Sequence, residues 1–97
     1  MNLYDNEGYK LLVKALMSIE TEEECKALLD DLMTKKELLD VAQRILVAKM
    51  LSEDTVYSKI VEETGASTAT ISRVNRSYLY GSDGYAAVFK KLGEESK

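Results

Sequence analysis

The hydrophobic and polar positions of the chain recur at helical spacing over most of its length. A first apolar face, predicted on a helix from about Asn6 to Ile19, comprises Tyr9, Leu12, Val13, Leu16 and Met17. A second apolar face comprises Cys25, Leu28, Leu29, Leu32 and Met33. Spacings of three and four residues place side chains on one side of an α-helix. The pattern therefore predicts two amphipathic helices, preceded by a few frayed residues, and no part of the chain reads as a strand.

Two of the predicted helix starts carry the same sequence signature. Thr21 is followed three residues later by Glu24, and Thr34 is followed by Glu37. Such a pair forms a capping box, in which each side chain accepts a hydrogen bond from the other residue's backbone amide. Carboxylates are also favourable near the positive end of the helix dipole. The acidic run at residues 22–24 therefore indicates a helix start and not a metal site.

The helix that begins after Thr34 is predicted to run to about Leu51, and it is apolar nearly all the way round. Its apolar members are Leu38, Leu39, Val41, Ala42, Ile45, Leu46, Val47, Ala48, Met50 and Leu51. A helix that is apolar on all sides must be covered on all sides. A chain of 97 residues cannot easily do this with its own helices. We therefore expect a homodimer, with a dimerisation core formed by the helices within residues 6–54.

Arg44 stands among the apolar residues of this long helix. We expect its charged end either to extend to the surface or to pair with a carboxylate, such as that of Asp40 or one from a partner chain. The simplest interpretation of Arg44 is a structural ion pair.

Residues 55–77, with the sequence TVYSKIVEETGASTATISRVNRS, predict two short helices joined by a tight turn. Thr55 is expected to cap the first helix, because its hydroxyl can accept a hydrogen bond from an unpaired amide of the first turn. Gly65 is expected to end that helix in the left-handed backbone conformation that a residue without a Cβ adopts at little cost. Ser67 then begins the second helix. This arrangement is a helix-turn-helix.

The side chains of the two short helices divide into an inner and an outer set. The inner set, placed to pack the helices together, is Ile60, Val61, Ile71 and Val74. The outer set is polar and consists of Thr68, Thr70, Ser72, Arg73 and Arg76. Hydroxyl and guanidinium groups can hydrogen-bond to base edges and phosphates.

The last part of the chain predicts a turn and one further helix. Gly81 and Gly84 bracket the turn, and a short helix over residues 85–92 is expected to fold back on the core. Tyrosines at positions 78, 80 and 85 could stack on bases or on a ligand, but we favour a packing role for them. The whole chain, residues 1–97, is thus predicted to form one small all-α domain.

Composition and charge narrow the classes of function. The net charge is −4, and the chain has one cysteine and no histidine. Residues 1–54 carry seven basic and twelve acidic side chains, whereas residues 64–80 carry two arginines and no acid. The acidity therefore lies in the predicted scaffold, and the weak positive field of the two-helix unit predicts a shallow salt dependence for any DNA binding.

Catalysis finds little support in these residues. Without histidine, a metal-ligand cluster or a phosphate-binding loop, no set of side chains suggests an active site, so we expect neither an enzyme nor a bound metal or cofactor. Cys25 lies in an apolar stripe and is interpreted as a buried structural thiol. With no apolar run of signal-peptide or membrane-spanning length, a cytoplasmic protein without membrane contact is expected.

The motifs GASTATISRVNRS and YGSDGY, after a helix opened by LMTKKE, resemble those of the tryptophan-repressor superfamily. Within it the chain is most similar to the Trp-repressor-related proteins of the YerC/YecD type, and the similarity covers about residues 31–92. The resemblance implies an all-α, intertwined homodimer of about six helices. It also implies that the second helix of the helix-turn-helix enters the major groove of double-stranded DNA.

Carried over position by position, the resemblance implies a DNA-facing set composed of Lys59, Ser67, Thr68, Ala69, Thr70 and Ser72. To this set we add Arg76 as a phosphate contact and Arg73 on the same exposed face. Short side chains of this kind suit base recognition that is partly mediated by water.

The resemblance also bears on a candidate effector pocket. In the repressor, a tryptophan corepressor lies between two arginines beside the reading helix. Arg44 and Arg73 match those two positions, and Thr34 matches a third pocket residue. Val74 stands where the repressor has a glycine, and its two methyl groups would enter the space of the indole ring. Tryptophan is therefore not expected as the corepressor, and the alternatives of another small effector or none stay open.

Two classes of function are compatible with the sequence. The first is a dimeric, sequence-specific DNA-binding regulator of transcription, most simply a repressor. The second is a helical protein-protein interaction module that keeps the fold without binding DNA, which the acidic scaffold would suit. We favour the first, because the exposed face of the predicted reading helix carries side chains able to bind bases and phosphates.

Overall fold

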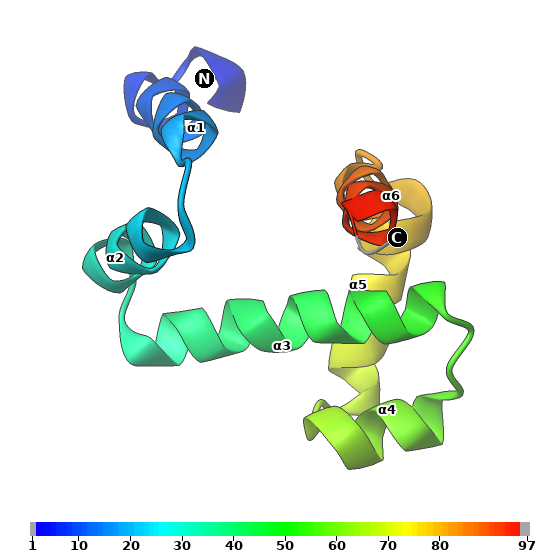
Figure 1. Ribbon diagram of the computed structural model, residues 1–97. Helices are drawn as coiled ribbons and strands as arrows, with labels where there is room; N and C mark the ends of the chain where they lie inside the picture. The colour runs from blue at the N-terminus through cyan, green and yellow to red at the C-terminus, as the bar shows by residue number, and fades with distance from the viewer. Residues whose placement is uncertain (1, 96–97) are drawn as a thin grey trace. The chain divides into compact units, whose positions relative to one another are not determined.

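The structure is a computed structural model, and it describes residues 2–95. These residues form one 3₁₀ turn and six α-helices and contain no strand (Figure 1). The elements are η1 (Leu3–Asp5), α1 (Glu7–Ser18), α2 (Glu22–Leu32), α3 (Lys35–Ser52), α4 (Tyr57–Thr64), α5 (Thr68–Tyr80) and α6 (Gly84–Glu95). The all-α fold of about six helices, predicted from hydrophobic spacing and from the resemblance, is confirmed.

The chain divides into two compact units, Met1–Leu38 and Leu39–Lys97. The boundary falls inside α3, so the first unit holds α1 and α2 and the second holds most of α3 with α4, α5 and α6. Each unit is described by itself below.

In the first unit, side-chain caps begin both α-helices, and the cap of α2 at Thr21 is the one predicted from the sequence. The side chain of Asn6 accepts a hydrogen bond from the Tyr9 amide at 2.9 Å at the start of α1. The Thr21 hydroxyl oxygen accepts one from the Glu24 amide at 3.1 Å at the start of α2. Because these bonds satisfy amides that have no partner within the helix, both starts are fixed by local sequence.

Three details of the first unit differ from expectation or refine it. Leu3–Asp5, in the segment predicted to be frayed, form the turn η1, where the Asn2 side chain accepts a hydrogen bond from the Tyr4 amide at 2.9 Å. The predicted buried thiol, Cys25, is only half-buried. On α1, Met17 is 81% exposed although it belongs to the predicted apolar face.

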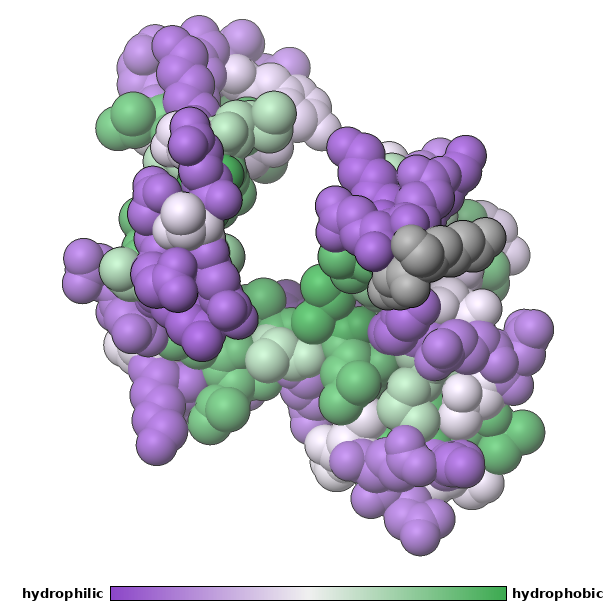
Figure 2. Space-filling view, viewed as in Figure 1, coloured by the Kyte–Doolittle hydropathy of each residue, from purple (hydrophilic) through white to green (hydrophobic). Residues whose placement is uncertain are grey.

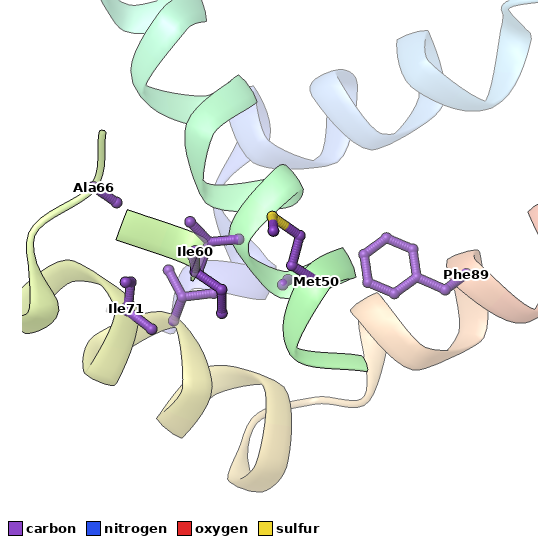
Figure 3. Packing of buried hydrophobic residues seen from close by; sticks show 8 residues of the cluster. Met50, Ile60, Ala66, Ile71 and Phe89 are labelled. Atoms are coloured by element: carbon purple, nitrogen blue, oxygen red, sulfur yellow. The ribbon is translucent and has the colours of Figure 1, made fainter. Parts of the chain in front are cut away.

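The second unit contains the hydrophobic core of the described chain (Figure 3). All four of its helices contribute, and the buried residues are Val47, Ala48, Met50, Ile60, Ala66, Ile71, Val74 and Phe89. The inner set predicted for the two short helices therefore packs as expected, with Val61 partly buried against it. Phe89 brings α6 onto this core, as the fold-back prediction requires.

The helix α3 is only half covered in the single chain. Its C-terminal half is buried at Val47, Ala48 and Met50, whereas Leu39 is 61% exposed. Other apolar side chains of the helix also remain exposed, namely Val41, Ile45 and Leu46. Hydrophobic surface is visible along α3 in Figure 2. The predicted all-round burial of this helix would need a second chain.

The predicted N-cap of α4 is wrong. The helix begins at Tyr57, its N-cap is Val56, and no side chain caps it. Thr55 instead belongs to the end of α3. Its amide donates a hydrogen bond to the Met50 carbonyl at 3.0 Å, and the Asp54 amide donates one to the Leu51 carbonyl at 3.0 Å. These two bonds form a Schellman motif, which closes a helix through a residue in the left-handed conformation. Here that residue is Asp54, with a φ of 59°.

Two predicted helix ends are also displaced. The helix α5 continues three residues beyond Ser77 to Tyr80, because the first stop signal that the chain meets is Gly81. The last helix spans Gly84–Glu95 instead of residues 85–92.

Candidate functional site

The turn between α4 and α5 is held by hydrogen bonds from three directions. Gly65 ends α4 with a φ of 72°, and its amide donates to the Val61 carbonyl at 2.9 Å. The Thr64 hydroxyl donates to the Ile60 carbonyl at 2.7 Å and accepts from the Ala66 amide at 3.1 Å. From α3, the side-chain amide of Gln43 donates to the Thr64 carbonyl at 3.1 Å. The turn is therefore fixed both locally and by the long helix.

The role of Gln43 could not be derived from the sequence. It stands out there only as a polar residue in an apolar helix, and its partner is 21 residues further along the chain. The packing of α3 against the helix-turn-helix brings the two together.

The second helix of the motif starts at a serine cap. The Ser67 hydroxyl oxygen accepts a hydrogen bond from the Thr70 amide at 3.1 Å and donates its own proton to the Thr70 hydroxyl at 3.0 Å. Ser67 is thus the N-cap of α5, as its position after the turn predicts.

Most of the predicted DNA-facing residues lie on the exposed side of α5. The exposed members are Ser67, Thr68, Ala69, Ser72, Arg73 and Arg76. Thr70 differs, because it is half-buried. Ile71 and Val74 point inward and are 0% and 3% exposed. The burial of these two residues orients the helix and leaves a polar face outside.

Lys59 lies on the exposed surface of α4, within the same unit. Its ammonium group is 3.8 Å from the Glu63 carboxylate, one helical turn later. An exposed ion pair of this kind contributes little to stability, so the lysine remains able to exchange this partner for another anion.

A polar cavity of about 420 Å³ lies between α3, α5 and the start of α6. It brings together Arg44, Arg73 and Val74, three of the four residues of the candidate effector pocket. The remaining lining residues are Asp40, Gln43, Thr70, Ser77 and Tyr85. The volume falls within the range of roughly 300–1,000 Å³ that is usual for small-molecule sites.

Thr34 is the fourth candidate pocket residue. It belongs to the first unit, where its hydroxyl accepts a hydrogen bond from the Glu37 amide at 3.1 Å and its own amide donates to the Glu37 carboxylate at 2.9 Å. This is the capping box predicted at the start of α3.

Val74 packs in the core and also borders the cavity. The resemblance predicts that the two methyl groups of Val74 enter the space that an indole ring would occupy. The structure keeps a cavity open beside it, because only 3% of the valine surface is exposed and its isopropyl group points mainly into the core. Val74 therefore affects the shape of the cavity without closing it.

A second and more apolar cavity of about 520 Å³ was not anticipated from the sequence. Its walls come from α3, the turn after α5 and α6, through residues that include Ile45, Val88 and Phe89. The only sequence signal is the apolar face of the last helix. Ser77 and Tyr85 line both cavities.

Within residues 2–95, no group of three or more histidine, cysteine, aspartate or glutamate side chains is arranged to hold a metal ion. None of the helices in this described range has the length and hydropathy needed to cross a membrane.

Together, the packed α4–α5 pair, its capped turn and the exposed polar face of α5 define an all-α protein of the helix-turn-helix class. A family model described as Trp repressor protein matches residues 7–93. The chain therefore belongs to the Trp repressor protein family.

Relatives support this assignment over nearly the whole chain. YerC of Bacillus subtilis (strain 168), a protein of uncharacterized function, is 47% identical over 83 residues, which cover 86% of this chain and 80% of YerC. The crystal structure of a TrpR-like protein from Eubacterium eligens ATCC 27750 matches with a TM-score of 0.90 and 46% identity, covering 96% of each chain. A candidate Trp repressor from Staphylococcus aureus matches with a TM-score of 0.87 and 39% identity, covering 93% of this chain and 90% of the other.

Proposed function

We propose that the protein is a sequence-specific DNA-binding regulator of transcription, most simply a repressor, which acts as a homodimer through α4 and α5. One observation carries this proposal. The side of α5 that faces away from the core is exposed and polar, and between Thr64 and Tyr80 it carries arginines and no acidic residue. Membership of the Trp repressor family supports the same conclusion.

In this proposal α5 enters the major groove of the DNA. The turn at Gly65 holds α4 against the N-terminal end of α5. The short side chains of Thr68 and Ser72 hydrogen-bond to base edges directly or through water, while Ala69 permits close approach. Arg73 and Arg76, further along the same helix, bind phosphates and set its depth in the groove. Lys59 reaches the backbone from α4 by exchanging Glu63 for a phosphate.

The electrostatic part of the affinity is modest. A protein loses about 0.9 units of log K per unit of log salt for each phosphate that it neutralises. Only three basic side chains of each chain lie in the proposed contact set, and Glu62 and Glu63 lie on α4 beside them. DNA binding should therefore respond less steeply to salt than that of strongly basic repressors.

A homodimer is the second part of the proposal, because one chain leaves large apolar side chains uncovered on α1, α3 and α6. A partner chain would bury them and hold two reading helices at the spacing of adjacent major grooves, roughly 34–36 Å. The polar cavity beside α5 is the candidate effector site, and its residues Arg73 and Val74 belong to the reading helix itself. A regulator that has lost its tryptophan response is consistent with a valine at position 74.

The test is an electrophoretic shift of fragmented genomic DNA at low salt, with the native protein and two double variants. Arg73→Ala with Arg76→Ala should weaken retention by at least about tenfold, since a hydrogen bond to a charged group contributes about 1.5–3 kcal/mol. Lys90→Ala with Lys91→Ala removes the same charge from α6 and should change retention little.

Retention of no fragment by the native protein would overturn the DNA-binding proposal. So would an equal loss in the two double variants, because it would show only non-specific charge attraction. Either result would favour the alternative function, a helical protein-protein interaction module, which the net charge of −4 suits.

A further inference from the structure

The first turn of α5 contains a pair of hydroxyl groups that bond to each other. Ser67 donates to the Thr70 hydroxyl at 3.0 Å and accepts from the Thr70 amide at 3.1 Å. A serine hydroxyl has one proton and two acceptor positions. Its only proton and one acceptor position are therefore used within the helix, and Ser67 has little capacity left for a base.

Thr70 differs in orientation from its neighbours on α5. It is half-buried and lines the polar cavity together with Arg44 and Arg73, whereas Thr68 and Ser72 are exposed. Among residues 2–95, no hydrogen bond engages the hydroxyls of Thr68 and Ser72. The hydroxyls of Thr68 and Ser72, which are free to bind DNA, thus lie on the outer side of α5. The hydrogen-bonded pair of Ser67 and Thr70 lies at the start of the helix, with Thr70 on the cavity side.

The start of α5 also differs from two other helix starts of the same chain. There, Thr21 and Thr34 are each followed three residues later by a glutamate. Glu37 completes a charged capping box with Thr34. The Glu24 carboxylate instead accepts a hydrogen bond from the Thr21 hydroxyl at 3.3 Å, while the Glu24 amide donates to that hydroxyl. After Ser67 the corresponding residue is Thr70, whose neutral hydroxyl takes the place of the carboxylate. A glutamate here would place a negative charge in the first turn of the helix proposed to meet DNA phosphates.

We infer that Ser67 and Thr70 are positioning residues, which fix the first turn of the reading helix through an uncharged cap, and that Thr68, Ala69 and Ser72 read the bases. This inference rests on the proposed DNA-binding function and deepens it. It divides five of the six DNA-facing residues that the resemblance implies into a pair that fixes the start of the helix and three residues that determine the base preference.

The first test separates positioning from reading. A preferred site is selected from a random DNA pool with the native protein, and dissociation constants are measured for it and for each single base-pair variant. Thr70→Val keeps the shape of the side chain and removes the hydroxyl. It should weaken binding to all sites by a common factor of about three to ten, the size expected for the loss of the one hydrogen bond between the two hydroxyls. Thr70→Ser should restore binding.

Thr68→Ala and Ser72→Ala are the matched comparison, because each removes an exposed hydroxyl from the same helix. Each should flatten the preference at a particular base pair. A change of preference at one base pair in Thr70→Val, similar to that in Thr68→Ala, would overturn the inference.

A second variant, Thr70→Glu, separates helix stability from DNA binding. It completes a charged capping box like that of Thr34 and Glu37, so the melting temperature should stay the same or rise. Binding to the selected site should nevertheless fall by more than tenfold, because the added carboxylate places a negative charge in the first turn of the helix that meets the phosphates. Unchanged DNA affinity in Thr70→Glu would contradict the need for an uncharged cap.

Amide hydrogen exchange tests the cap independently of DNA. The Thr70 amide should exchange faster in Ser67→Ala, which removes its acceptor, and to a smaller extent in Thr70→Val. Unaltered exchange in both variants would overturn the positioning role, whether or not DNA binds. If the native protein binds no DNA, the proposed function and the base-reading part of the inference both fall, while the exchange data still decide the role of the cap.

Discussion

The backbone carbonyl of Ser77 accepts a hydrogen bond from the Gly81 amide at 2.9 Å and occupies the space that a Cβ at position 81 would need. This contact ends α5 and directs the chain towards α6. The carbonyl belongs to the helix backbone, so it cannot move aside as the end of a flexible side chain could. Position 81 therefore requires glycine because a Cβ would clash with the Ser77 carbonyl, and not because the backbone has a positive φ.

Gly81→Ala should consequently destabilise the protein by about 2 kcal/mol or more, the size typical of an unrelieved overpacking contact. Gly84→Ala is the matched control, three residues away, where an added Cβ meets nothing within 4 Å. It should be neutral or slightly stabilising, since alanine is the better helix former. Urea unfolding at a fixed protein concentration measures both changes. Equal effects of the two substitutions would contradict the role given to the Ser77 carbonyl.

Asp54 closes α3 in the left-handed conformation, with a φ of 59°. Because this conformation is costly for a residue with a Cβ and is the usual place for glycine at a helix end, Asp54→Gly should raise the free energy of unfolding by about 0.5–1 kcal/mol. Asp54→Ala removes the carboxylate and keeps the Cβ, so it should give no such gain. Thermal unfolding followed by circular dichroism distinguishes them, and a similar gain in both would assign the effect to charge.

The proposed homodimer predicts a sedimenting species of about twice the 10.9 kDa chain mass at micromolar concentration. Leu39, which is 61% exposed on α3, is expected to lie in the interface, so Leu39→Glu should shift the protein towards the monomer. Leu79 is 53% exposed near the end of α5, and Leu79→Glu should leave the mass unchanged. A native protein that is a stable monomer would rule out the proposed dimer.

The native protein is predicted to give no binding heat with L-tryptophan in titration calorimetry. Val74 lines the polar cavity at the position where the repressor pattern has glycine, and Asp40 lines the same cavity. Val74→Gly should open space for a planar ring. Because a glycine in the middle of a helix costs about 1 kcal/mol and the side chain is also lost from the core, Val74→Ala serves as a second variant that is easier to fold. Tight binding of tryptophan by the native chain would show that the steric argument is wrong.

The helices themselves could be predicted from the sequence because their determinants are local. Hydrophobic residues at spacings of three and four identify the buried faces, and threonine or serine caps mark several of the starts. Gly65 could also be identified as the turn of the helix-turn-helix, because its left-handed backbone conformation, with a φ of 72°, ends a helix through contacts with only the few residues before it. The displaced start of α4 is the exception. There, the amide of Thr55 is taken by the end of α3, and two local signals compete for one residue.

Tertiary packing alone decided what these helices bring together. Arg44 and Arg73 are 29 positions apart in sequence and line one cavity only because α3 packs against α5. The same packing gives Gln43 its partner at Thr64 and places Thr70 on the cavity side of α5 while Thr68 and Ser72 stay outside. Helical periodicity is a local property of the chain, whereas the side to which a residue at the edge of a helix faces depends on which distant helix covers it.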